Sequence, residues 1–427
     1  MKANVVHGDF NPCGGAERLS LVTIQSISEM GINFDVTTLQ SPDISKLENS
    51  FGKNLVSVLN KADKINVISI LKELWQHQHQ FLGEHEDNYN YDITINTNGD
   101  AAPYYHSSFS KNNAITYCHY PSTQYHIEIE NREYLRTDLG MTEWANISSK
   151  GESHKGYEDK NSNNNNGNSN NNKPKETELQ FRKRKYYFEI IKYGYQNLMN
   201  NSLVVTNSAF SCRAIANTFK LDDIRILSPP IDIETFHNIA LMSNGNNKNK
   251  DTILVISRIA PHKKIENAIK LAKILKDNNV GRGMKIVGNL YHYFLDYYSG
   301  LQQMIEKLDL TEYITFEINA SLGKLLSIIR NSSIYFHPMV GEHFGMSIIE
   351  ALAAGLVTVV PKEGGASEFV PQRYQYDTIK RAADIITYTL NHPSKEDRIS
   401  VKGLGNFSNS QYIAGFQNIV NELINHK

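Results

Sequence analysis

The sequence predicts an α/β fold with two domains, each built around a parallel β-sheet. Short apolar runs of strand length alternate with longer helical segments along nearly the whole chain. This alternation restarts after a polar segment, and 427 residues are too many for one ordinary hydrophobic core. Strands separated by helix-length segments are typical of βαβ units, in which neighbouring strands run parallel.

The strand candidates fall into two sets. The first set is 4–7, 34–39, 92–96, 114–118, 203–206 and 224–227. The second set is 252–257, 284–287, 314–316, 333–337 and 357–360. One intervening helix is clear, because its apolar residues recur at i, i+3, i+4 and i+7 and form a single stripe. These residues are Ile265, Ala268, Ile269 and Ala272.

The two sets of strands define the expected domain boundaries. We expect an N-terminal Rossmann-like domain over residues 1–229 and a C-terminal one over residues 251–427. Two prolines and an Asn/Lys-rich run favour a linker over residues 230–250. A helix candidate at 408–425 follows the second set and could cross back to the first domain.

Two segments of the first domain have an unusual composition. An Asn-rich tract at 161–172, within an insertion of about residues 150–176, predicts a disordered loop. A basic, aromatic-rich helix is predicted directly after it, over 181–195. Its charges either form a solvated helix face or contact a membrane surface or a lipid headgroup. The sequence leaves both interpretations open.

Composition and charge exclude several classes of protein. The net charge is −1, so bulk electrostatics predicts no nucleic-acid binding. The three cysteines, Cys13, Cys118 and Cys212, lack metal-ligand spacing, and reduced thiols are expected. No apolar signal-peptide core or run of ~18 apolar residues occurs, which predicts a cytoplasmic protein or one on the cytoplasmic face of a membrane.

The strongest functional signal is the stretch 338–355, which follows a predicted strand and opens a predicted helix. It places Glu342, Phe344 and Gly345 in the loop and Glu350 on the helix. A glycine at a helix start lets backbone N–H groups approach a phosphate, and the helix dipole favours the negative charge. A carboxylate such as Glu350 can accept hydrogen bonds from the vicinal hydroxyls of a ribose. The alternative is an ordinary capped helix with surface charges.

A second signal is Arg258 and Lys263, which follow the first strand of the second domain. Ligands of open α/β sheets bind beyond the carboxyl ends of the strands. An Arg and a Lys placed there can clamp a diphosphate, since one offers a fork and the other a point charge. The alternative is a solvated strand-to-helix turn.

Two weaker signals lie in the first domain. Gly14 and Gly15 form a glycine turn that opens a helix, although the turn lacks the GxGxxG spacing of a dinucleotide site. His119 ends a predicted strand and could face the cleft between the domains. A lone histidine is more often a structural residue, so this alternative stays open as well.

These four elements together resemble the family 4 retaining glycosyltransferases of the GT-B fold, in which two Rossmann-like domains face each other across a cleft. The resemblance includes the E-x7-E motif, here Glu342 to Glu350, and the loop 364–368. It implies that Arg258 and Lys263 hold the donor diphosphate. It also implies that Glu350 contacts the ribose and Glu342 the transferred sugar. The implied catalytic residues are His119 and Glu342, and the implied donor-binding residues are Gly14, Gly15, Arg258, Lys263, Phe344, Gly345 and Glu350.

The segment 119–122 is similar to the His-Tyr-Pro element of the mannosyltransferases that extend the dolichol-linked oligosaccharide core. The resemblance implies retaining transfer of a hexose, mannose in that sub-family, from a nucleoside diphosphate sugar to a hydroxyl of a glycan or lipid-linked acceptor. No cofactor is expected, and no metal, because the chain has no D-x-D motif. Lys264 stands where the family often has a glycine.

Two other functions remain open from the sequence. One is another enzyme of the same fold, such as a sugar-nucleotide epimerase or a phosphorylase, which the E-x7-E motif beside an Arg and a Lys fits less well. The other is a non-catalytic subunit that binds a sugar nucleotide or a glycan. The retained glycines, cations and glutamates favour an enzyme over the second alternative.

Overall fold

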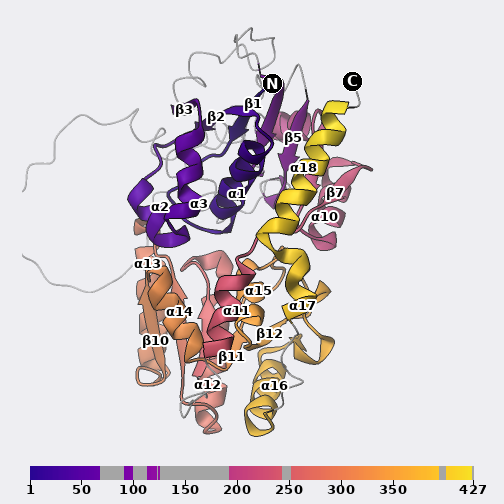
Figure 1. Cartoon of the computed structure of the whole chain (residues 1–427). Helices are drawn as coiled ribbons and strands as arrows, with labels where there is room; N and C mark the ends of the chain where they lie inside the picture. Colours follow the sequence, from indigo (N-terminus) through magenta and orange to yellow (C-terminus); the bar gives the residue numbers. More distant parts are fainter. Residues whose placement is uncertain are drawn as a thin grey trace, which may run out of the picture.

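The computed structural model describes residues 1–67, 91–99, 113–122, 124–125, 192–242, 252–393 and 401–425. These residues form two α/β domains, which lie one above the other in Figure 1. Every strand pairing within the described residues is parallel, as the alternation of strands and helices predicts. The predicted α/β class is confirmed.

The N-terminal sheet has, within the described residues, the strand order β3-β2-β1-β4-β5-β6-β7. Its strands are β1 (Lys2–Val6), β2 (Asn33–Thr38), β3 (Lys64–Val67), β4 (Ile93–Asn96), β5 (Ala114–Tyr117), β6 (Leu203–Thr206) and β7 (Ile224–Ile226). The central strands β4 and β5 are buried along their whole length. Strands covered on both faces read as continuous apolar runs, which is why these two are recognisable in the sequence.

The C-terminal sheet has, in the same described part of the chain, the order β10-β9-β8-β11-β12-β13. Its strands are β8 (Thr252–Ile256), β9 (Gly283–Gly288), β10 (Ile314–Ile318), β11 (Ile334–Phe336), β12 (Val357–Pro361) and β13 (Gln375–Tyr376). In both sheets the order reverses beside the first strand, which in such folds opens a crevice at the carboxyl edge.

Helices connect the strands of both sheets. They are α1 (Gly15–Glu29), α2 (Ile44–Phe51), α3 (Lys53–Val56), α10 (Ala209–Phe219), α11 (Ile233–Met242), α12 (Ile265–Asp277), α13 (Leu295–Lys307), α14 (Leu322–Arg330), α15 (Met346–Ala353), α16 (Ile379–Asn391), α17 (Val401–Leu404) and α18 (Asn409–Asn425). Short 3-10 turns are η1 (Ser57–Lys61), η3 (Pro261–Lys263), η4 (His292–Phe294), η5 (Gly365–Glu368), η6 (Gln372–Tyr374) and η8 (Gly405–Phe407).

All eleven predicted strands are present, with ends within two residues of the expected ones. The sequence missed β3 and β13, which lie at one edge of each sheet. Most of β3 is exposed and β13 has two residues, so neither contributes a long apolar run. Edge strands need less apolar sequence because one side has no neighbouring strand.

The expected linker differs from the structure, because helix α11 occupies much of residues 230–250. Its apolar residues Ile233, Phe236 and Ile239 are buried in the core of the C-terminal domain. They recur every three residues and so share one face of the helix. The nearby prolines and polar residues favour a linker, but α11 belongs to the C-terminal domain.

The last helix, α18, crosses back to the N-terminal domain, and Figure 1 shows it in yellow alongside that domain. Tyr412, Phe416 and Val420 are buried with the core residues of the first sheet. The Tyr412 hydroxyl lies 2.7 Å from Thr23 Oγ1 of α1. The end of the chain therefore ties the two domains together.

Two predicted segments lie largely outside the described residues. These are the Asn-rich tract and residues 181–191 of the basic aromatic helix. Residues 192–200 are helical and bury Tyr195, Leu198 and Met199 in the first domain. Among the helices that the structure describes, none has the length and apolarity needed to cross a bilayer.

Candidate active site

A cavity of about 540 Å³ lies between the two domains, lined by residues that follow the carboxyl ends of β5, β6, β8 and β11. All nine residues predicted for the site line it, from both domains. They are Gly14, Gly15, His119, Arg258, Lys263, Glu342, Phe344, Gly345 and Glu350. Because the predicted residues come from separate segments, their convergence is a property of the tertiary structure. Their individual roles remain predictions.

The glycine turn lies against the first turn of α15. A Cβ atom on Gly15 would lie 2.6 Å from Met346 Sδ, so glycine permits this close approach between the domains. The Gly14 amide donates a hydrogen bond to the Glu17 carboxylate, which is buried. Burial alone would raise the pKa of Glu17, but the neighbouring His7 lowers it below the usual value. A buried carboxylate thus holds the turn in place.

The loop after β11 opens α15 through Gly345, whose φ of 89° lies in the left-handed region. A side chain there would also collide with Ile348. The first amides of a helix have no partner within the helix, so the start of α15 presents N–H donors and a positive dipole end. Phe344 anchors the loop from the other side, because its ring is 5% exposed and packs on Phe369 and Phe407.

Lys263 and Glu342, predicted to bind different parts of a donor, bond to each other in this structure. Lys263 Nζ lies 2.9 Å from Glu342 Oε2, and His337 Nε2 lies 3.2 Å from the same oxygen. Burial would raise the pKa of Glu342, but Lys263 and His337 hold it well below its usual range. Glu342 is therefore ionised at neutral pH, although only 12% of its side chain is exposed.

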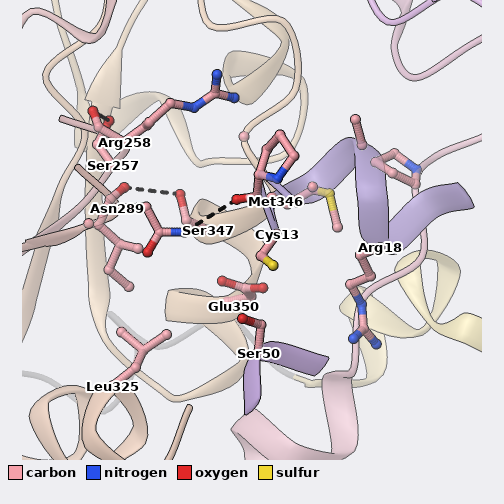
Figure 2. A pocket seen from close by; sticks show the side chains of 18 of the residues that line it. Cys13, Arg18, Ser50, Ser257, Arg258, Asn289, Leu325, Met346, Ser347 and Glu350 are labelled. Atoms are coloured by element: carbon pink, nitrogen blue, oxygen red, sulfur yellow. Dashed lines mark hydrogen bonds between the residues drawn. The ribbon is translucent and has the colours of Figure 1, made fainter. Parts of the chain in front are cut away.

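Glu350 lines the same cavity as Arg18 of α1 and Arg258, and Figure 2 shows the Arg258 guanidinium pointing away from it. Burial raises the pKa of Glu350 to about 7, Arg18 opposes this rise, and Asp232 adds to it. Arg18 also donates hydrogen bonds to the Pro230 carbonyl and to Asn409 Oδ1, at 3.2 and 3.1 Å. Arg18 follows the glycine turn closely in the sequence, but no role for it was predicted.

The pKa of Glu350 predicts a pH-dependent stability. A carboxyl whose folded-state pKa is about 7, against 4.5 as the ordinary value, stays protonated in the fold while the unfolded chain ionises. Stability should therefore fall as pH rises from about 4.5 to about 7. Glu350→Gln should melt above the wild type at pH 8, and the difference should vanish near pH 4.5. The exposed Glu306→Gln should show no such trend in the same thermal melts. A pH-independent difference for Glu350→Gln would contradict this prediction.

His119 is a half-buried, neutral imidazole. Its Nε2 lies 3.2 Å from the Thr97 carbonyl, an acceptor, so Nε2 carries the proton and Nδ1 has the lone pair. Burial lowers the pKa of His119 to about 4. At neutral pH this side chain can therefore accept a hydrogen bond or a proton at Nδ1 but carries no positive charge.

Three contacts that the sequence did not predict fasten the domains beside the cavity. The rings of Tyr120 and His343 stack with centroids 3.9 Å apart. Ser208 Oγ donates to the His343 carbonyl at 2.8 Å. The Glu368 carboxylate accepts from the amides of Ala209 and Phe210 at the start of α10. The sequence gave one signal for this last contact, because Glu368 belongs to the loop 364–368 that contributes to the family resemblance.

Lys264, which stands where the resembled family often has a glycine, has an unfavourable backbone conformation. Lys264 precedes α12 with φ 53° and ψ 44°, a left-handed conformation that costs a non-glycine residue ~1–2 kcal/mol. Glycine has a more flexible unfolded state, which offsets ~0.4–1 kcal/mol of this difference. Lys264→Gly should thus raise the free energy of unfolding by about 0.5–1 kcal/mol in urea melts. The matched Lys270→Gly, within α12, should lower it by about 1 kcal/mol. Equal destabilisation by both changes would contradict the expectation.

Two facing parallel-sheet domains with a cleft between them define the GT-B fold of glycosyltransferases. Solved structures of this fold superpose on the present chain over the full length of each. The similar structures include sucrose-phosphate synthase from Thermosynechococcus elongatus, at a TM-score of 0.66 and 12% identity with 100% of each chain covered. HepE of Anabaena, solved with UDP and glucose, has a TM-score of 0.62 and 16% identity with the same coverage.

The family comparison agrees with the fold. Residues 240–403 match the family described as "Glycosyl transferases group 1". Among curated proteins, the chain is similar to the GDP-Man:Man(3)GlcNAc(2)-PP-Dol alpha-1,2-mannosyltransferases. The Dictyostelium discoideum protein is 25% identical over 259 residues, 56% of this chain and 51% of that protein. The Mus musculus protein is 28% identical over 187 residues, 42% of this chain and 38% of that protein.

These comparisons confirm the resemblance to glycosyltransferases of the GT-B fold. They also agree with the similarity that the segment 119–122 indicated, since the relatives are mannosyltransferases of dolichol-linked glycans. The chain spans about half the length of the first of these relatives and less of the second. The activity, substrates and partners of this chain are therefore matters for a proposal.

Proposed function

We propose that this protein transfers a sugar, with retention, from a nucleoside diphosphate sugar to a hydroxyl of a glycan or lipid-linked acceptor. One observation carries the proposal: a single cavity brings together the cations Arg258 and Lys263, the start of α15, and the carboxylates of Glu342 and Glu350. The cations and the helix start suit a diphosphate, and the carboxylates suit hydroxyl groups. An ordinary structural cleft has no need for this arrangement.

The donor would be bound by groups of the C-terminal domain. Arg258, Lys263 and the first amides of α15 would hold the diphosphate, and Glu350 would accept hydrogen bonds from the ribose. The sugar would extend toward Glu342 and the N-terminal domain. Because Lys263 bonds to Glu342 in this structure, a bound diphosphate would compete with Glu342 for the lysine.

The same groups would assist the reaction. Negative charge gathers on the departing diphosphate while the anomeric carbon becomes oxocarbenium-like. Fixed cations and helix amides stabilise that charge well because they are already oriented toward it and need little reorganisation during the reaction. Glu342, held ionised, would stabilise positive charge on the sugar. His119 has a lone pair at Nδ1 and could accept a hydrogen bond from a sugar hydroxyl.

The relatives support a narrower choice of substrates. Their names specify GDP-mannose as donor and a dolichol-linked glycan as acceptor. We extend this to a mannose donor and a lipid-linked acceptor for the present chain. Such an acceptor would place the protein at the cytoplasmic face of a membrane, which the basic helix predicted from the sequence at 181–195 could contact.

We expect transfer without a metal or cofactor, because side-chain cations would neutralise the diphosphate. Excess EDTA should leave most of the turnover intact in an assay of released nucleoside diphosphate. A metal-dependent glycosyltransferase assayed in parallel should lose its activity under the same conditions. Loss of nearly all turnover that Mn²⁺ or Mg²⁺ restores would contradict the metal-free proposal.

The proposed function is tested with a panel of UDP-, GDP- and ADP-sugars. Thermal shift measures binding, and product analysis with a lipid-linked oligosaccharide measures transfer and anomeric configuration. The expected result is binding of one donor class, GDP-sugars first, and a product that keeps the donor's α configuration. Tight donor binding without transfer to any acceptor would favour the non-catalytic subunit instead. No binding of any nucleotide sugar would overturn both.

A further inference from the structure

His337 follows β11 and is buried beside Glu342, with 2% of its surface exposed. The sequence assigned it no role. Its two ring nitrogens approach different groups. Nδ1 lies 3.1 Å from the Tyr335 hydroxyl, and Nε2 lies 3.2 Å from Glu342 Oε2. The imidazole therefore bridges the sheet and the carboxylate that is predicted to face the donor sugar.

The chemistry of the neighbours determines the proton positions on this imidazole. An ionised carboxylate can only accept, so Nε2 must carry the proton that points to Glu342. Nδ1 can then accept from the Tyr335 hydroxyl, which lies closer to it than to the Ile256 carbonyl, at 3.1 against 3.3 Å. Ser347 Oγ, in the first turn of α15, lies 2.9 Å from the same Tyr335 hydroxyl. A continuous chain of groups thus joins the helix start to Glu342.

The contact between His337 and Glu342 is close but poorly aligned. Among the described residues, Nε2 has no partner in good hydrogen-bond geometry, although it is buried. Lys263 Nζ occupies the same carboxylate oxygen at 2.9 Å, while the other oxygen accepts from the His343 amide at 3.2 Å. A buried N–H without an aligned acceptor is unfavourable, so a small rotation of Glu342 toward His337 would stabilise the site.

That rotation becomes possible when Lys263 is drawn away. Under the proposed function, the donor diphosphate recruits Lys263 and removes the strongest partner of Glu342. The largely buried carboxylate then needs a donor that stays in place. His337 is fixed from behind by Tyr335, and it has no flexible stem with which to follow the diphosphate. Preorganised support of this kind governs how accurately a catalytic group is placed.

We propose that His337 is a positioning residue: it takes over the Glu342 carboxylate from Lys263 when a donor binds, and it aims that carboxylate at the transferred sugar. This inference rests on the proposed function. It assigns the imidazole no contact with the substrate. Its predicted effect is therefore on the turnover number and not on the binding of the nucleotide.

The test combines His337→Leu and His337→Gln with Glu342→Gln. His337→Leu should lower kcat by about 10²-fold while the Kd for GDP alone stays within about twofold. His337→Gln, whose amide can still donate to Glu342, should recover most of that loss. Added to Glu342→Gln, the His337→Leu change should lower kcat by less than about threefold, because the group to be positioned is already altered. The exposed His392→Leu is the matched control and should leave kcat unchanged.

Other outcomes would overturn the inference. If His337→Leu lowers kcat by the same factor with and without Glu342→Gln, the two residues act independently. If His337→Gln is as impaired as His337→Leu, the imidazole does not act through Glu342. The same conclusion follows if either substitution weakens GDP binding as much as it lowers kcat. The glutamine variant keeps the test valid if the leucine variant does not fold. Absence of transfer by the wild type would instead overturn the proposed function.

Discussion

Glu342→Gln should lower the turnover number for sugar transfer by about 10²–10³ while the affinity for free GDP changes little. An interaction made chiefly in the transition state contributes ~2.7–4 kcal/mol, which corresponds to this loss of rate. Glu342 is largely buried and ionised, and glutamine keeps its shape while removing the charge. The measurement is kcat by product formation, with the Kd for GDP from calorimetry.

Lys263→Ala should behave differently, because Lys263 would hold the diphosphate in the ground state as well. It should weaken donor binding and lower turnover together. Lys273→Ala is the matched control, since Lys273 pairs with Asp277 on the exposed face of α12, away from the residues that line the cavity. Surface pairs of that kind contribute about 0–1 kcal/mol, so the control should bind and turn over like the wild type.

The loss from Glu342→Gln would be contradicted by wild-type transfer rates in a variant whose melting curve shows that it is folded. In that case Glu342 would be an ordinary loop residue, for which substitutions change stability by no more than about 0.5 kcal/mol. A loss of GDP binding as large as the loss of kcat would show that Glu342 holds the nucleotide and not the sugar.

Gly365→Ala should lower transfer by about 10²-fold and also reduce stability. A Cβ atom at Gly365 would overlap the backbone carbonyl of His343, which lies in the loop that carries Glu342. Because the overlap is with backbone atoms, it cannot be relieved by rotating a side chain. The same carbonyl also accepts the hydrogen bond from Ser208 Oγ. Forced backbone shifts of this kind cost ~1–3 kcal/mol, and displacement of a catalytic group by about 1 Å can cost 10²-fold in rate.

Gly323→Ala provides the matched control for this glycine. Gly323 lies in the first turn of α14, and a Cβ atom there would meet no atom within 4 Å. Alanine is also the better helix former, so this variant should be as stable as the wild type or slightly more so. Thermal melts and kcat are measured for both variants. Equal activity of Gly365→Ala and Gly323→Ala would show that the loop tolerates displacement.

The fold was largely predictable from local sequence because buried parallel strands carry continuous apolar runs. The runs at 93–96, 203–206 and 357–361 appear in the sequence as strands because nearly every residue in them is buried. The edge strands β3 and β13 escaped the same reasoning because they need few apolar residues. Helix α11 escaped because its buried face lies within a segment bordered by prolines and polar residues.

The site was predictable where its chemistry lies in one short stretch. Glu342, Gly345 and Glu350 follow one strand, so their spacing alone places a glycine at a helix start between two carboxylates. His337 directly precedes this stretch but gave no signal. Its proposed role depends on its position between the Tyr335 hydroxyl and Glu342 Oε2, which only the folded structure shows. Arg18 was missed for a related reason: its partners, Pro230 and Asn409, are far away in sequence.

The sequence by itself determined the α/β class, the division into two sheets, and the residue types available at the end of each strand. Periodicity and short motifs carry this information, because they depend on residues within a few positions of one another. Only the tertiary structure decided that Lys263 bonds to Glu342, that His337 supports the same carboxylate, and that α18 returns to the first domain. These contacts depend on how distant segments pack. Packing brings Lys263 and His337 to Glu342, which keeps that carboxylate ionised, and it buries Glu350, which raises the pKa of that carboxyl to about 7.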